Sequence, residues 1–232
     1  MEAAGVLAQV TSPWITDNHH VEGLTKHVPR IVSTLTSLAR LQCGDDSLLL
    51  VTAALANLSF MESTSLQVMN KLSTMETLLD RASMSPFTSV FVRDQVVTVM
   101  ANMAADCKEE VMLNNSLEFL ASQLETRMEG AKTPAEQSAV ERILKKSAIA
   151  LCRVCQGEEQ AQMFESMGVV QRAVELCKFP FKRNYSDSVL VACLALLRRV
   201  RSFLPHSAEQ SLLQESLVHS FREFSIHQES YV

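Results

Sequence analysis

A stretch of apolar residues rich in alanine and leucine recurs four times along the chain at nearly constant spacing. The copies are Asp46–Phe60, Gln95–Asp106, Ser147–Gln156 and Ser188–Ser202. When their alanine and leucine residues are aligned, one polar residue near the end of each copy falls in register, at intervals of 45, 51 and 46 residues. These polar residues are Asn57, Asn102, Arg153 and Arg199. Because helical repeats of about 40–47 residues build solenoids, the spacing predicts an all-α solenoid of about four irregular repeats.

The composition agrees with a folded, helix-rich chain. Of the 232 residues, 47% are hydrophobic and only 6 are glycine and 6 proline. The net charge of −5 argues against a general nucleic-acid or anionic-membrane surface. No apolar run reaches the roughly 18 residues that a membrane span needs, and the first residues show no basic signal-peptide region. We therefore expect a cytoplasmic protein whose six cysteines are reduced.

The positions of proline and polar residues predict where the helices begin and end. Pro29 is expected in the first turn of a helix that ends near Leu41, and Pro134 and Glu136 in the first turn of one that reaches Gln156. Another helix is predicted over Ser116–Met128. Near the C-terminus, a capping-box pattern at Ser207 predicts an amphipathic helix to about Phe224 that caps the solenoid.

The third-helix sequences carry a family resemblance. Ala54-Leu55-Ala56-Asn57-Leu58 and the related Met100-Ala101-Asn102-Met103 resemble the third helix of armadillo repeats, and Glu2–Gly5 and Glu165–Gly168 resemble a second element of that pattern. The resemblance implies an armadillo domain over residues 1–224, followed by a flexible tail at 225–232.

A closer resemblance is to the C-terminal part of the Inscuteable family. It rests on the four irregular repeats, the 6% aromatic content and the C-terminal Glu229-Ser230-Tyr231-Val232. The family comprises adaptors of cell polarity, asymmetric cell division and spindle orientation, so the resemblance implies work at the cell cortex with a PDZ scaffold of the Bazooka type. The family's segment for Pins/LGN precedes its armadillo region and has no obvious counterpart here, which leaves open whether this chain is a fragment.

In armadillo proteins the third helices line a concave groove, and a ladder of asparagines there binds the backbone of an extended peptide. An amide can pair with a peptide N–H and C=O together, and Asn57 and Asn102 match this pattern. Arg153 and Arg199 replace it and favour an acidic or phosphorylated ligand. Neighbouring cations add to this preference: Lys145, Lys146, Arg198 and Arg201. The alternative is that the asparagines only cap or bridge helices and the arginines form a solvated face.

Two other functions are less favoured by the residues. The residues argue against importin-like binding of basic peptides. Armadillo proteins of that kind carry a tryptophan one turn before the asparagine, and this chain has another residue there in each repeat. The residues at these positions are Ala53, Thr98, Ile149 and Ala195. A purely structural role, as one segment of a larger assembly, stays open.

The last three residues form a candidate PDZ ligand. Ser230-Tyr231-Val232 fits the pattern Ser/Thr-x-apolar at a free carboxyl end. PDZ domains add such a tail as a strand and bury its last side chain. Val232 would fill the pocket and Ser230 would hydrogen-bond within it.

No motif predicts catalysis, a cofactor or a metal. Cys152-x-x-Cys155 is a single pair within an apolar helix and favours core packing over zinc or redox chemistry. His19-His20 is a lone pair in a loop. The chain lacks the nucleophile, metalloprotease and phosphate-binding glycine motifs. We therefore expect a non-catalytic adaptor.

Overall fold

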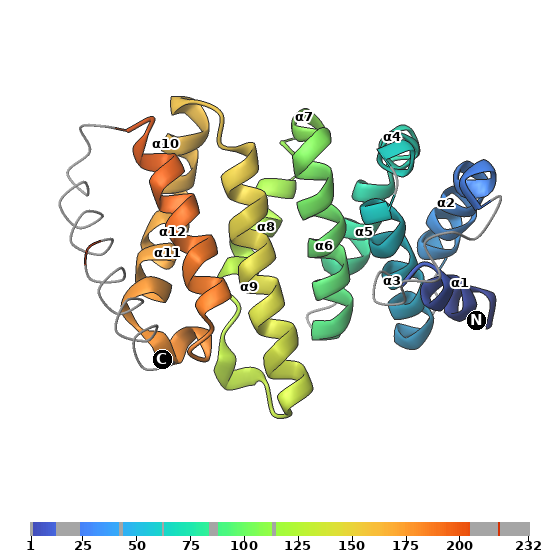
Figure 1. Cartoon of the computed structure of the whole chain (residues 1–232), viewed down its shortest axis with the longest axis horizontal. Coiled ribbons are helices and arrows are strands. Elements are labelled where there is room, and N and C mark those ends of the chain that lie inside the picture. The colour runs from blue at the N-terminus through green and yellow to red at the C-terminus, as the bar shows by residue number, and fades with distance from the viewer. Residues whose placement is uncertain are drawn as a thin grey trace, which may run out of the picture. The chain divides into compact units, whose positions relative to one another are not determined.

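The computed structural model describes residues 2–12, 24–41, 44–61, 63–83, 88–112, 115–204 and 218. These residues form α-helices, two 3-10 segments and the loops between them (Figure 1). The chain divides into two compact units, Met1–Ser116 and Leu117–Val232. The predicted capping helix, the PDZ tail and the pair His19-His20 lie outside the described residues, residue 218 excepted.

The first unit is built on three long helices that succeed one another in space. Helix α3 packs against α1 and α6, and α2 packs against α3, α4 and α5. Leucine and methionine side chains on α3 and α6 are fully buried between them, among them Leu55, Leu58 and Met100. The helices of this unit are α1 (Glu2–Val10), α2 (Leu24–Arg40), α3 (Asp45–Met61), α4 (Ser63–Lys71), α5 (Thr74–Ser83), α6 (Val90–Asp106) and α7 (Lys108–Val111).

The second unit repeats this plan. Helix α12 packs against α9 and α11, and α10 packs against α11 and α12. Phe164 on α10 and Ile143 on α9 are completely buried. The elements are α8 (Ser116–Leu124), η2 (Met128–Gly130), α9 (Pro134–Val154), α10 (Glu158–Ser166), α11 (Val169–Lys178), η3 (Pro180–Arg183) and α12 (Asp187–Arg201). The apolar stretches of the sequence therefore correspond to α3, α6, the second half of α9 and α12. We call the four helices α3, α6, α9 and α12 the third helices.

The start of α9 was predicted correctly. Thr133 Oγ1 accepts a hydrogen bond from the Glu136 backbone N–H at 3.2 Å, and the Glu136 carboxylate accepts from the Thr133 backbone N–H at 2.9 Å. Pro134 occupies the first turn, where its missing N–H leaves no carbonyl unpaired. Backbone hydrogen bonds from Thr133 and Lys132 lower the pKa of the Glu136 carboxyl. Helix α9 ends at Val154, two residues before the predicted end.

Two predicted helix boundaries were wrong. Helix α2 begins at Leu24, so Pro29 lies inside the helix and not in its first turn. Burial of Val28 and Val32 on either side of this proline offsets the hydrogen bond that it removes. The predicted helix Ser116–Met128 ends at Leu124, because the carbonyls of Leu124 and Thr126 bind a side chain from α11, described below.

Candidate peptide-binding surface on the third helices

In the first unit, the two ladder asparagines tie consecutive long helices together. Asn57 on α3 donates from Nδ2 to the Ala8 carbonyl oxygen on α1 at 2.9 Å. Asn102 on α6 donates from Nδ2 to Ser59 Oγ on α3 at 2.9 Å. The contact between α1 and α3 is thus of the same kind as the contact between α3 and α6. Helix α1 therefore takes the place of the third helix in a preceding, shorter repeat.

Only part of each asparagine amide takes part in the contact between helices. Both side chains are half-buried, and each uses one N–H for the link between helices. Within the described ranges, neither Oδ1 has a partner. The bridging alternative raised by the sequence is therefore real for both residues.

Arg199 makes the corresponding link in the second unit. Its Nε donates to the Cys155 carbonyl oxygen at the end of α9 at 2.8 Å. Its guanidinium lies 5.0 Å from the centroid of the Phe203 ring. The side chain is exposed, and its two Nη groups have no partner in the part of the chain that the structure describes. Arg199 is thus held by its inner nitrogen while its outer edge faces solvent, the geometry that bidentate recognition of an oxyanion needs.

Arg153 lies on α9 two residues before Cys155, and its side chain is exposed. The alignment of the sequence placed Arg153 and Arg199 at equivalent positions of successive third helices, and α9 and α12 are in direct contact. The acceptors Ala8, Ser59 and Cys155 carry no signal of their own in the sequence. The only signal for these acceptors is their position, about one repeat before the residue that donates to each of them.

The charge of the third helices changes between the two units. Helix α3 carries two acidic residues and no basic one, and α6 carries two acidic residues and one basic. Helix α9 carries two acidic and four basic residues, and α12 carries one acidic and three basic. The carboxylate of Glu141 on α9 is engaged by Asn184 Nδ2 at 2.6 Å. A surplus of positive charge therefore collects on α9 and α12 in a chain whose net charge is −5.

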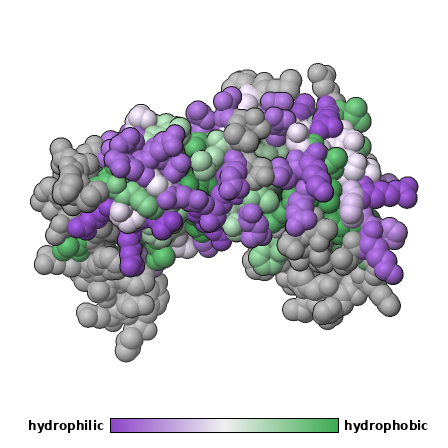
Figure 2. Space-filling model, turned by 90° about the horizontal axis from the view of Figure 1, so that it is seen from above, coloured by the Kyte–Doolittle hydropathy of each residue, from purple (hydrophilic) through white to green (hydrophobic). Residues whose placement is uncertain are grey.

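The basic residues of α9 and α12 are all exposed or half-exposed. They are Arg142, Lys145, Lys146, Arg153, Arg198, Arg199 and Arg201. Seen from above, the surface of the described residues mixes hydrophilic residues with hydrophobic ones (Figure 2).

The CxxC pair is part of the core. Cys155 is completely buried and Cys152 half-buried. Burial raises the pKa of the Cys155 thiol to about 11 and also raises the pKa of Cys152, so both remain thiols at neutral pH. Cys155 lies just after the last residue of α9 rather than inside it. Among the described residues, no group of three or more His, Cys, Asp and Glu could hold a metal ion.

Comparison with known proteins gives a family and a fold. The family model for the Protein inscuteable C-terminal region matches residues 1–232. Relatives from Mus musculus and Homo sapiens, each called Protein inscuteable homolog, are both 34% identical over 238 residues. The match covers 100% of this chain and 41% of each relative, so the chain spans about two fifths of the length of these curated relatives.

Three engineered proteins of known structure share the fold. A designed armadillo repeat protein has a TM-score of 0.67 at 18% identity, over 96% of this chain and 84% of its own. A second one, in complex with the peptide (KR)4, has a TM-score of 0.65 at 15% identity, over 98% and 83%. A further engineered protein reaches 0.67 at 15% identity, over 96% and 82%. The predicted all-α, armadillo-type solenoid is confirmed.

No helix in the described ranges has both the length and the apolar character to cross a bilayer.

Proposed function

Because this chain belongs to the Inscuteable C-terminal family, whose armadillo-type fold is that of a protein-interaction adaptor, we propose that it binds an extended acidic or phosphorylated peptide on α9 and α12. The proposed contacts are Arg153 and Arg199 for the acidic groups. In the first unit, Asn57 and Asn102 would hydrogen-bond a peptide backbone. No step of this function needs catalysis, a cofactor or a metal.

The observation that carries the proposal is the change of charge on the third helices. Four basic residues on α9 and three on α12 face or partly face solvent, whereas α3 carries none and α6 one. The designed armadillo protein of similar fold was solved with the basic peptide (KR)4. A basic third-helix surface in the same fold calls for the opposite charge in its ligand.

A structural role is the second candidate, and two observations favour it. Asn57 bonds α1, Asn102 bonds α3, and Arg199 bonds Cys155 directly after α9. Arg153 and Arg199 also lie in the last turns of their helices, where positive charge is favoured by the helix dipole without any ligand. Charge reversal at Arg153 and Arg199 distinguishes the two functions. If a ligand is bound there, the reversal weakens ligand binding far more than folding. If the arginines are structural, it weakens folding.

We further propose that Ser230, Tyr231 and Val232 form a ligand for a PDZ scaffold of the Bazooka type. The support is the terminal pattern and the family membership. In this account the chain serves in cell polarity, asymmetric division and spindle orientation at the cell cortex. A Pins/LGN-type adaptor would bind through a family segment that has no obvious counterpart in this sequence.

Deletion of Tyr231 and Val232 should weaken binding to a polarity-scaffold PDZ domain by about ten- to a hundredfold, because burial of one valine side chain contributes roughly 1.5–3 kcal/mol. Isothermal titration of the full chain with the purified PDZ domain measures the change. Tyr231→Ala is the matched control and should bind almost normally, since alternate side chains of an added strand point away from the pocket. Equal affinity of the deletion variant and the unaltered chain would remove the PDZ assignment.

A further inference from the structure

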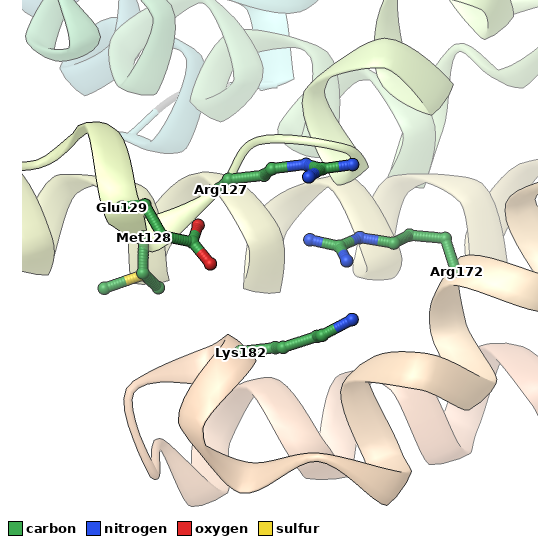
Figure 3. Close-up of a pocket in the computed structure, with 5 residues that line it drawn as sticks. All are labelled: Arg127, Met128, Glu129, Arg172 and Lys182. Carbon is green, nitrogen blue, oxygen red and sulfur yellow. The ribbon is translucent and has the colours of Figure 1, made fainter.

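The second unit contains a small pocket away from the third helices. It has an accessible volume of about 50 Å³ and is lined by five residues: Arg127, Met128, Glu129, Arg172 and Lys182. They come from the segment around η2, from α11 and from η3. Figure 3 shows the positively charged ends of Arg127, Arg172 and Lys182 turned toward one another across the opening. The charged ends of three cations thus border one small pocket.

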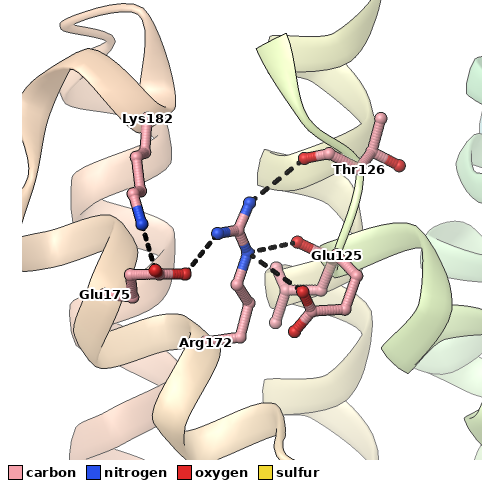
Figure 4. A network of polar contacts seen from close by, with 6 residues as sticks. Glu125, Thr126, Arg172, Glu175 and Lys182 are labelled. Atoms are coloured by element: carbon pink, nitrogen blue, oxygen red, sulfur yellow. Dashed lines mark hydrogen bonds and ion pairs between the residues drawn. The ribbon is translucent and has the colours of Figure 1, made fainter. Parts of the chain in front are cut away.

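Arg172 is fixed in place by its neighbours. Its side chain is 5% exposed, and it donates from Nε to the Leu124 carbonyl at 3.1 Å and from Nη2 to the Thr126 carbonyl at 3.2 Å. Its Nη1 donates to Glu175 on the same helix (Figure 4). The buried guanidinium thereby joins α11 to the end of α8 beside the pocket.

Glu175 already serves two of the three cations. It accepts hydrogen bonds from Lys182 and from Arg172 (Figure 4), and these contacts, with Lys182 the larger cause, lower the pKa of its carboxyl. Glu125 lies 3.7 Å from Arg172 Nε but is 54% exposed. Arg127 has no hydrogen-bond or ion-pair partner among the residues that the structure describes. Of the three cations, Arg127 is thus the one without a direct partner in the described residues, and the carboxylate of Glu129 lines the same opening.

Glu175 offsets part of the repulsion between these cations, and an anion bound in the pocket would offset more of it. We propose that the pocket binds the phosphate group of a phosphorylated side chain from a partner protein, with Arg127 as its main contact and Lys182 and Arg172 as supporting donors. A phosphate monoester fits the small volume, whereas a nucleotide is too large. Glu129 is exposed and also lines the opening, so its side chain has room to turn toward solvent on phosphate binding.

Two aromatic rings beside the pocket extend the site to a peptide. Phe179 and Phe181 are 44% and 56% exposed. The Lys182 ammonium lies 5.2 Å from the Phe179 ring centroid, and the two rings are 5.9 Å apart. A ligand that places an apolar side chain next to its phosphorylated residue would cover both rings. This site uses none of Asn57, Asn102, Arg153 and Arg199.

The test titrates the full chain, by nuclear magnetic resonance, with the blocked dipeptide phosphoserine-phenylalanine. Arg127→Gln should weaken binding about tenfold or more, because it removes a charge-assisted hydrogen bond. Glu129→Gln should strengthen it severalfold, because it removes a carboxylate that repels the phosphate. Lys71→Gln, an exposed cation on α4, is the matched control and should bind as the unaltered chain does.

Three results would overturn the proposal. One is the absence of saturable binding by the unaltered chain. Another is equal binding by Arg127→Gln, and the third is equal binding of the unphosphorylated dipeptide. If inorganic phosphate binds as tightly as the phosphodipeptide, the pocket is a free-phosphate site and the assignment to a partner protein is wrong. Arg153→Glu with Arg199→Glu should leave this binding unchanged, which keeps the test independent of the third-helix surface.

Discussion

Replacement of Arg153 and Arg199 by glutamate together should weaken the binding of an acidic, phosphorylated peptide by at least about a hundredfold. Each arginine lost removes hydrogen bonds to a charged group, worth roughly 1.5–3 kcal/mol, and each glutamate gained adds repulsion. The probe is an octapeptide of alternating glutamate and phosphoserine, and fluorescence polarisation gives its affinity. The outward edge of Arg199, held from behind by the Cys155 carbonyl, is the part of the surface most directly affected.

The same double variant should unfold at nearly the same temperature as the unaltered chain. It loses the hydrogen bond from Arg199 to Cys155, worth about 0.5–1.5 kcal/mol, which lowers the melting temperature by only several degrees. The control is Lys26→Glu with Lys71→Glu, which changes the net charge equally at exposed positions of the first unit. If this control weakens binding as much, the effect is one of overall charge. If the Arg153 and Arg199 variant fails to fold, the two residues are structural.

Phe164→Ala should destabilise the second unit by about 3–5 kcal/mol, the usual cost of removing a fully buried phenylalanine side chain. Phe164 has no exposed surface and lies on α10, which packs against α11 and α12. The cavity that remains weakens the packing of α10 against α12. Peptide binding to the basic surface should therefore be lost at a lower urea concentration than in the unaltered chain. Urea unfolding followed by far-ultraviolet circular dichroism measures the change.

Phe181→Ala is the control for this variant. Phe181 lies on η3 and is 56% exposed, and its replacement should change the free energy of unfolding by no more than about 0.5 kcal/mol. A loss below about 1 kcal/mol for Phe164→Ala would contradict the packing described for α10.

The third helices and their register followed from the sequence because they repeat. The copies of the alanine- and leucine-rich stretch recur at nearly constant spacing, and Asn57, Asn102 and Arg199, which make the hydrogen bonds between elements, lie at the aligned positions. Local chemistry also predicted the start of α9, since proline, threonine and glutamate there act within one turn.

Contacts between distant residues could not be predicted in this way. Nothing near Leu124 in the sequence marks the end of α8, which is bound by Arg172, 48 residues further on. The pocket at Arg127 was missed for the same reason, because its cations are far apart in the chain. The sequence predicted Pro29 in the first turn of a helix because proline fits there without losing a hydrogen bond. In the structure the helix starts earlier, and the buried Val28 and Val32 hold this proline inside it.

The proposed peptide surface is tested most directly by nuclear magnetic resonance of the unaltered chain during titration with the acidic phosphorylated octapeptide. The side-chain Nε–H signals of Arg153 and Arg199, and the backbone amides of the second half of α9 and of α12, should shift most and saturate together. An octapeptide of alternating lysine and arginine should leave them in place. The largest shifts on α3 and α6, or equal shifts with the basic peptide, would contradict an acidic ligand on α9 and α12.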